Sequence, residues 1–265
     1  MKVISQSTVL LSAIVLLTGA VAVPGSAQVP TVLLAQASAG DLVNRGVDKA
    51  EKGDLQGAVA DFTEAIRLNP SYSLAYNNRG NAYSALGDEK RAILDFTKAI
   101  QINQNWGNIN LPVAYYNRGI SYRRQGNFKA AIEDYSTAIR LNPKYVDAYL
   151  NRGVAKRRQG DIKGALNDYN AAIRINPNLP EGYYNRGILY YMDKKYKDAI
   201  AEYARAIELR PDYADAYFNR AIVYANLNDR KTAIKDLQTA AEIYQKKGDS
   251  KNYKDAVQFI DQLQR

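Results

Sequence analysis

The 265-residue sequence contains no cysteine and no histidine. Without these residues the chain has no disulfide, no thiol nucleophile, no imidazole base and none of the usual zinc ligands. It also lacks a glycine-rich phosphate-binding loop and any recognisable pairing of a nucleophile with a base. We therefore expect a protein that is not an enzyme, has no catalytic residue and carries neither a metal nor a cofactor.

Basic residues outnumber acidic ones, and tyrosine is far more frequent than tryptophan. The chain has 36 Lys and Arg against 27 Asp and Glu, a formal net charge of +9. A basic balance favours acidic partners or anionic surfaces without identifying one. Tyrosine occurs 21 times, whereas tryptophan occurs once.

The tripeptide Asn-Arg-Gly occurs five times, and Asn219-Arg220-Ala221 is a sixth, altered copy. The interval between successive copies is constant, except that the one between Asn78 and Asn117 is longer. A fixed period of this size indicates a stack of similar supersecondary units. We expect six units, at 39–72, 73–106, 112–145, 146–179, 180–213 and 214–247, with an inserted loop at 103–111.

Each unit predicts two helices. In the third unit, Tyr115, Gly119 and Tyr122 are spaced by four and three residues, so they share one face of a first helix. Gly126 interrupts this helix, because glycine tolerates the left-handed conformation at a helix end. A second apolar face follows from Phe128 to Ile139, before Pro143. The small residues on both helices are expected to let the two backbones approach closely.

The pattern Tyr-x-x-Arg-Gly-x-x-Tyr, then Ala-x-x-x-Tyr, then Asn-Pro resembles the tetratricopeptide repeat (TPR) family. Tyrosine stands where that family commonly has tryptophan, and arginine where it commonly has leucine. The resemblance implies an all-α, right-handed α-solenoid of six helix pairs plus a C-terminal capping helix within 248–265. It does not fix the function, because repeat scaffolds serve many roles.

The N-terminal residues resemble an export signal. Lys2 precedes an apolar run at 9–17, and Gly25-Ser26-Ala27 supplies small residues for cleavage. We expect 1–27 to be a cleaved signal peptide and 28–38 a flexible spacer, which would place the protein in the periplasm or an equivalent extracytoplasmic compartment. An uncleaved N-terminal membrane anchor is the alternative.

Three polar features have ordinary structural interpretations. The recurring asparagines are expected to bond the backbone at repeat junctions, and the recurring arginines to lay their stems over aromatics with their heads in water. Acids such as Asp134 are expected on a solvated face. Trp106 occupies the slot of Tyr145 and Tyr213, which favours packing between repeats over ligand contact.

In tetratricopeptide repeats the first helices line a concave groove. Here the matching positions are mostly apolar and aromatic from the third unit on, and a basic patch borders them. We expect these side chains to be exposed, to bind a ligand and to contribute little to stacking. The candidate groove residues are Tyr116, Ile120, Arg123, Arg124, Leu150, Val154, Arg157, Arg158, Tyr184, Ile188, Tyr191, Phe218 and Ile222.

The sequence thus favours a scaffold that binds a protein or peptide segment during assembly or maintenance of an envelope complex. A segment that combines acidic residues with apolar anchors would suit the groove. A self-assembling structural protein is the first alternative, and a nucleic-acid-binding solenoid is a weaker one. The identity of the partner, the oligomeric state and the cellular process do not follow from the sequence.

Overall fold

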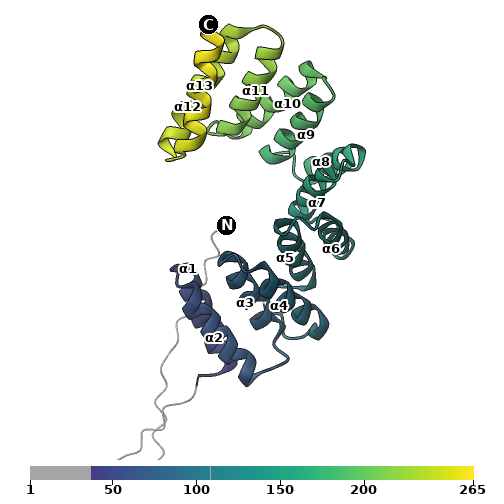
Figure 1. Ribbon diagram of the computed structural model, residues 1–265. Coiled ribbons are helices and arrows are strands. Elements are labelled where there is room, and N and C mark those ends of the chain that lie inside the picture. Colours follow the sequence, from purple (N-terminus) through teal and green to yellow (C-terminus); the bar gives the residue numbers. More distant parts are fainter. Residues whose placement is uncertain (1–36, 108) are drawn as a thin grey trace, which may run out of the picture. The chain divides into compact units, whose positions relative to one another are not determined.

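The computed structural model describes residues 37–107 and 109–265 (Figure 1). The predicted signal peptide and residues 28–36 of the predicted spacer lie outside this part of the chain. Within it the only regular elements are α-helices, thirteen in number. The all-α stack of helix pairs expected from the sequence is therefore confirmed.

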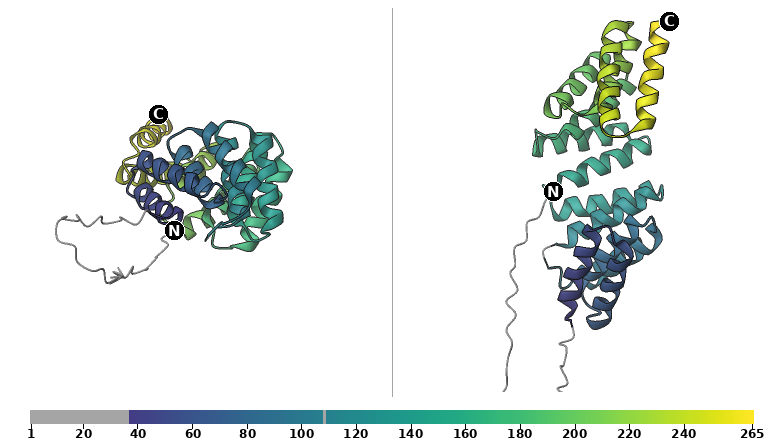
Figure 2. Two further views of the ribbon diagram at one scale, coloured as in Figure 1. Left: turned by 90° about the horizontal axis from the view of Figure 1, so that it is seen from below. Right: turned by 90° about the vertical axis from the view of Figure 1, so that its left-hand side faces the viewer.

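The helices follow one another as six pairs and one final helix (Figures 1 and 2). Each first helix packs on the second helix of its own pair, and each second helix packs on the first helix of the next pair. We number these pairs as repeats 1 to 6. The helices are α1 (Ala39–Glu51), α2 (Leu55–Leu68), α3 (Ser73–Ala85), α4 (Glu89–Ile102), α5 (Leu111–Arg124), α6 (Phe128–Leu141), α7 (Val146–Arg158), α8 (Ile162–Ile175), α9 (Pro180–Met192), α10 (Tyr196–Leu209), α11 (Ala214–Asn226), α12 (Arg230–Lys246) and α13 (Ser250–Gln264).

The turn inside each repeat is built by two local signals. The second residue after the first helix has a positive φ, as at Gly126 (78°) and Gly160 (86°), where glycine has no Cβ to clash. Lys194 and Asn228 adopt the same conformation in repeats 5 and 6, at 56° and 62°. A side chain then caps the second helix in five repeats: Asp54, Asp88, Asn127, Asp161 and Asp229 each accept a bond from a backbone N–H of the first turn.

The recurring glycine of the first helix faces the aromatic ring of the second. A Cβ atom on Gly153 would lie 2.5 Å from Cε1 of Tyr169, a fully buried ring. The same opposition recurs with Phe62, Phe96, Tyr135 and Tyr203 in the other repeats. In repeat 6, Ala221 takes the position of the glycine and Leu237 takes the position of the aromatic residue.

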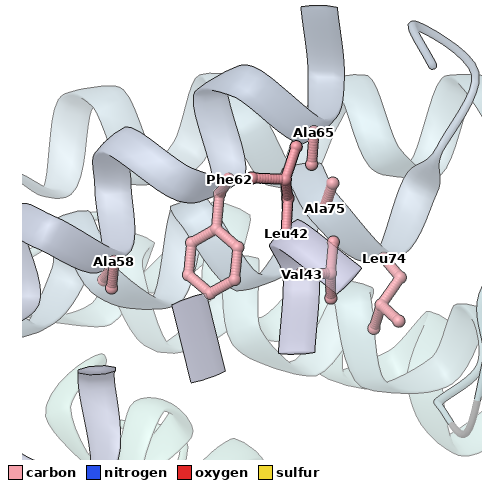
Figure 3. Close-up of a cluster of buried hydrophobic side chains, with 8 residues drawn as sticks. Leu42, Val43, Ala58, Phe62, Ala65, Leu74 and Ala75 are labelled. Carbon is pink, nitrogen blue, oxygen red and sulfur yellow. The ribbon is translucent and has the colours of Figure 1, made fainter. Parts of the chain in front are cut away.

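The core continues from one repeat into the next. Figure 3 shows Leu42 and Val43 of α1 beside Phe62 of α2, with Leu74 and Ala75 of α3 completing the cluster. At the other end, α13 covers the last repeat, with Tyr253, Val257 and Ile260 packed against α11 and α12. The apolar face that each helix pair leaves open is therefore buried by the neighbouring pair or, at the end of the stack, by α13.

The expectation that the recurring arginines hold their heads in water is wrong for repeats 2 to 6, where these side chains are 16–18% exposed, whereas Arg45 of repeat 1 is 55% exposed. In repeat 3, Arg118 donates from Nε and Nη2 to the two carboxylate oxygens of Asp134, both at 2.8 Å. The Arg118 side chain is 16% exposed and that of Asp134 is 8% exposed, so the acid also does not lie on a solvated face. A third donor, Nη1, reaches Thr97 of repeat 2 at 2.9 Å. The guanidinium carbon lies 5.5 Å from the centroid of the Tyr115 ring, so it is the charged head that contacts an aromatic ring.

This arrangement recurs because every repeat carries both partners at the same spacing, with the acid on the second helix and the arginine on the first. The equivalent pairs are Arg45–Asp61, Arg79–Asp95, Arg152–Asp168, Arg186–Glu202 and Arg220–Asp236. In repeats 2 to 5 the arginine also bonds a side chain on the second helix of the preceding repeat. The Asn-Arg-Gly motif thus joins helices within a repeat and ties adjacent repeats together.

The asparagines also differ from expectation. The side-chain amide of Asn151 donates to the hydroxyl of Tyr116 in the preceding repeat at 3.1 Å, and Asn219 donates to Tyr184 at 2.8 Å. Their backbone contacts, where present, lie within their own helix, as from Asn151 to Asp147 O. For these two asparagines the junction partner is a tyrosine hydroxyl, whereas Asn117 donates to the side chain of Asn77 in the preceding repeat at 3.2 Å.

The inserted loop returns to the start of α3. The backbone N–H groups of Ser73 and Leu74 donate to the carbonyls of Gln104 and Asn105. Asn103 and Asn105 have positive φ values of 50° and 55°, which asparagine tolerates better than most residues. Trp106 is half-buried and donates from Nε1 to Asn103 at 2.9 Å. Its role in packing between repeats stays a prediction.

Candidate groove on the first helices

All thirteen predicted groove residues lie on the first helices α5, α7, α9 and α11. Arg124 and Arg158 are exposed, Leu150 is 8% exposed and buried, and the other ten are half-buried. Leu150 packs in the core between repeats 4 and 5 and is not a surface residue. The prediction of a continuous exposed apolar floor is therefore wrong at this position.

Two groove tyrosines belong to the junctions between repeats. Tyr116 stacks on Tyr135 and Tyr145 with centroid distances of 5.8 and 4.9 Å. Tyr184, two repeats later, has the same geometry with Tyr203 and Tyr213, at 6.0 and 4.9 Å. These rings hold neighbouring repeats together, so the expectation that they contribute little to stacking is wrong.

The remaining groove residues of repeats 5 and 6 are partly covered by their neighbours. The Tyr191 hydroxyl accepts a bond from Asn226 at 3.2 Å, and Ile188 packs in the cluster around Tyr203. Phe218 lies against Phe259 of α13, with ring centroids 6.3 Å apart. The C-terminal helix therefore borders the groove as well as covering the end of the stack.

The four predicted arginines divide into two kinds. Arg124 bonds the Ser84 hydroxyl at 2.6 Å and forms an ion pair with Glu89 at 3.1 Å. Within residues 37–107 and 109–265, Arg123, Arg157 and Arg158 have no ion-pair partner. The predicted basic patch thus contains three arginines without an ion-pair partner in the described residues, not four.

Repeats 3 and 4 also hold unsatisfied polar atoms at matching positions. Nε of Arg123 and Nε of Arg157 are buried without a hydrogen-bond partner in the described residues, as are the hydroxyls of Tyr135 and Tyr169. Burial raises the pKa of Tyr135 to about 12, and the positive charge of Arg123 offsets part of that rise. Buried polar atoms of this kind are uncommon and call for a physical explanation.

Hollows occur between adjacent first helices. One of about 370 Å³ lies between α1 and α3, where Val47, Phe62 and Ala82 line it. Another of about 190 Å³ lies between α3 and α5, and the predicted residues Ile120 and Arg124 line it. Both hollows lie among repeats 1 to 3, at one end of the predicted groove.

Sequence reasoning missed an acidic feature of the same helices. Asp147, Glu181 and Asp215 stand at the second position of α7, α9 and α11, so they recur at the same place in consecutive repeats. Glu181 forms an ion pair with Arg210. Burial raises the pKa of Asp147, and the charge of Glu181 adds to the rise. The regular spacing of these acids is visible in the sequence and could have revealed them.

The described residues offer little support for other kinds of site. No helix within 37–107 and 109–265 has the length and apolar character needed to cross a bilayer. The same residues contain no group of three or more acidic side chains placed to bind a metal ion together.

The repeated helix pairs define an α-solenoid, and sequence comparison gives the family. Models described as tetratricopeptide repeat or TPR repeat match 48–87, 73–105, 116–180, 168–201, 190–228 and 214–247. Together they cover 48–105 and 116–247, more than half of the 265 residues. The chain belongs to the tetratricopeptide repeat family.

Individual relatives are distant or share only a short segment. Human tetratricopeptide repeat protein 6 is 55% identical over 42 residues, which are 16% of this chain and 8% of that protein. The chain thus corresponds to a small part of this curated relative.

Two solved structures illustrate the shared fold. A chain of the APC/C hetero-tetramer Cut9–Hcn1 is 18% identical, and the match covers 86% of this chain and 43% of that one, with a TM-score of 0.69. YrrB, described as a TPR protein with an unusual peptide-binding site, is 23% identical over 68% of this chain and 90% of its own, with a TM-score of 0.55.

Proposed function

We propose that the chain is a non-enzymatic scaffold that binds a segment of another protein along the first helices of repeats 3 to 5. The observation that carries this proposal is the position of Arg123 and Arg157. These arginines occupy equivalent positions on the first helices of neighbouring repeats, so an arginine recurs at the same place in repeats 3 and 4. Within the described residues neither has an ion-pair partner. By contrast, the arginine of the recurring Asn-Arg motif is paired with an aspartate or glutamate in all six repeats. A bound anionic group would supply the ion-pair partner that both arginines lack.

The neighbouring side chains favour a segment of mixed character. Ile120 and Val154 are half-buried on α5 and α7, close in sequence to the two arginines. Burial of an apolar side chain against them would supply affinity, and an acidic side chain beside Arg123 or Arg157 would supply charge complementarity. YrrB indicates that this fold can carry a peptide-binding site.

We also propose that the protein is exported to the periplasm or an equivalent compartment and serves assembly or maintenance of an envelope complex. The support is the basic start, the apolar run at 9–17 and the small residues Gly25-Ser26-Ala27, all outside the described residues. The mature protein is expected to begin at Gln28. N-terminal sequencing of protein from cells tests this, and a chain that still begins at Met1 in the membrane fraction would establish an anchor instead.

The groove is tested with a partner purified from the envelope fraction, with the unaltered chain as bait. The key variant is Arg123→Gln/Arg157→Gln, which removes two of the three predicted groove charges that have no ion-pair partner in the described residues. The matched control is Arg140→Gln/Arg174→Gln, which removes two exposed charges from the second helices of the same repeats. We expect only the first variant to bind the partner more weakly. Light scattering on the same samples separates self-association from binding of a different protein.

A further inference from the structure

A pocket of about 140 Å³ lies where α13 meets the last two repeats. Tyr184 of α9, Asp215 and Phe218 of α11, Tyr244 of α12 and Asp255 of α13 line it. We call it the α11–α13 pocket. It brings two carboxylates and three aromatic rings together at one end of the candidate groove, through residues that are far apart in sequence.

The two carboxylates lack strong cationic partners. Within residues 37–107 and 109–265, Asp215 forms no ion pair, and Asp255 has only Lys251, at 3.7 Å. The Lys251 side chain is 85% exposed, so solvent screens this contact. By contrast, the buried Asp134 and Asp236 each accept two bonds from an arginine. Asp215 and Asp255 are both exposed, so the α11–α13 pocket presents to solvent negative charge that the described residues leave largely unpaired.

Several hydrogen-bond donors in the pocket lining are already engaged. The Tyr244 hydroxyl donates to Oδ1 of Asp215 at 2.6 Å. The side-chain amide of Asn219 donates to Tyr184 at 2.8 Å, and that of Asn252 donates to Asp249 at 2.7 Å. A carboxylate can accept about four bonds, so acceptor capacity remains in excess. A ligand suited to this lining must be a donor.

The aromatic rings favour a donor that is also a cation. The half-buried rings of Tyr184 and Phe218 and the largely buried ring of Tyr244 line the pocket, and aromatic rings attract ammonium and guanidinium groups through the ring quadrupole. Burial raises the pKa of Tyr184 to about 12, and the negative charge of Asp215 adds to the rise. Both the rings and the acids therefore stabilise positive charge in the same small volume.

We propose that the α11–α13 pocket binds a cationic side chain, the guanidinium or ammonium group of an arginine or lysine in a partner segment. This rests on the proposed function, because the cation belongs to the segment held by the groove. The occupant follows from charge complementarity: two carboxylates without strong partners lie beside three rings. Since Arg123 and Arg157 attract the opposite charge in repeats 3 and 4, the two places together would fix the direction in which a segment binds.

The test uses the full chain and small probes in place of the partner. Nα-acetyl-arginine amide and Nα-acetyl-lysine amide are titrated into ¹⁵N-labelled protein, and the side-chain amide signals of Asn219 and Asn252 are followed. Nα-acetyl-citrulline amide is the neutral counterpart of the arginine probe. We expect arginine or lysine to bind at least about fivefold more tightly than citrulline, the ratio that a cation–π contact and a screened ion pair can supply.

The variant Asp215→Asn/Asp255→Asn should lower the affinity of the arginine and lysine probes to that of the citrulline probe. It removes both charges while keeping the size of each side chain and a hydrogen-bond acceptor. Asp261→Asn removes an exposed charge from α13 and should bind like the parent. Thermal melting checks that the variants are folded. Equal binding of arginine and citrulline, or full binding by the double variant, would overturn the proposal. Because no partner protein is involved, that outcome would not contradict the proposed groove, which is tested separately.

Discussion

Replacement of Arg118 by methionine is expected to lower the free energy of unfolding by about 3 kcal/mol or more. The change leaves the carboxylate of Asp134, which is 8% exposed, without its cation, and an uncompensated buried charge is among the costliest defects in a folded protein. It also removes the bond from Arg118 to Thr97 of the preceding repeat. Urea denaturation followed by circular dichroism measures the loss.

The matched control is Arg152→Met in repeat 4. There Asp168 keeps a second cation, because Lys156 lies 2.9 Å from it, whereas repeat 3 has Tyr122 at the position of that lysine. The loss should be smaller, about 1–2 kcal/mol. Equal losses for the two variants would contradict the importance assigned to these ion pairs.

The destabilisation by Arg118→Met should also depend on pH. Burial already raises the pKa of Asp134 above 3.8 with Arg118 present, and removal of the guanidinium should raise it further. The folded state then binds a proton that the unfolded state releases, so the deficit is greatest above the raised pKa and shrinks as the pH falls through it. The deficit measured at pH 5 should be smaller than that at pH 8.

A second large effect is expected from Gly153→Ala, because its new Cβ would lie 2.5 Å from the buried ring of Tyr169. Overpacking of this kind costs on the order of 1–3 kcal/mol. Repeat 6 contains its own solution, with Ala221 opposite Leu237 at the same two positions. The double variant Gly153→Ala/Tyr169→Leu should therefore lose less stability than the sum of the single changes.

Gly40→Ala provides the control for glycine replacement in a helix. A Cβ there would meet only the Ser38 hydroxyl, at 3.7 Å, so the better helix propensity of alanine should stabilise α1 slightly. Chemical denaturation of the four variants measures the coupling. Strict additivity of Gly153→Ala and Tyr169→Leu would contradict the close contact between glycine and ring.

The sequence predicts the stack of helix pairs well, because the sequence signals for it are local and repeated. The fixed period of the Asn-Arg-Gly motif defines the units, the turn glycines require positive φ, and the spacing of residues such as Tyr115 and Tyr122 defines helix faces. Each signal is read from a few neighbouring residues. The all-α stack follows from them without knowledge of any contact.

The sequence predicts the site less well because contacts across repeats decide it. The sequence shows an arginine and an acid at one spacing in every repeat, as for Arg118 and Asp134, but this regularity alone does not distinguish an ion pair from two solvated side chains. The positions of Tyr116 and Tyr184 on the first helices predict the groove floor, whereas their rings also pack against the next repeat. The α11–α13 pocket depends on how α13 packs, and no short pattern encodes that.

The measurement that tests the proposed groove most directly is the dissociation constant of the purified partner at low and high salt. For Arg123→Gln/Arg157→Gln we predict affinity about tenfold weaker at low salt, with a smaller difference near 0.5 M salt, where exposed charges are screened. Arg140→Gln/Arg174→Gln should bind within about twofold of the parent, because a charge outside the interface acts only through weak long-range attraction. If the two double variants bind equally well at both salt concentrations, the partner does not bind along the first helices of repeats 3 to 5.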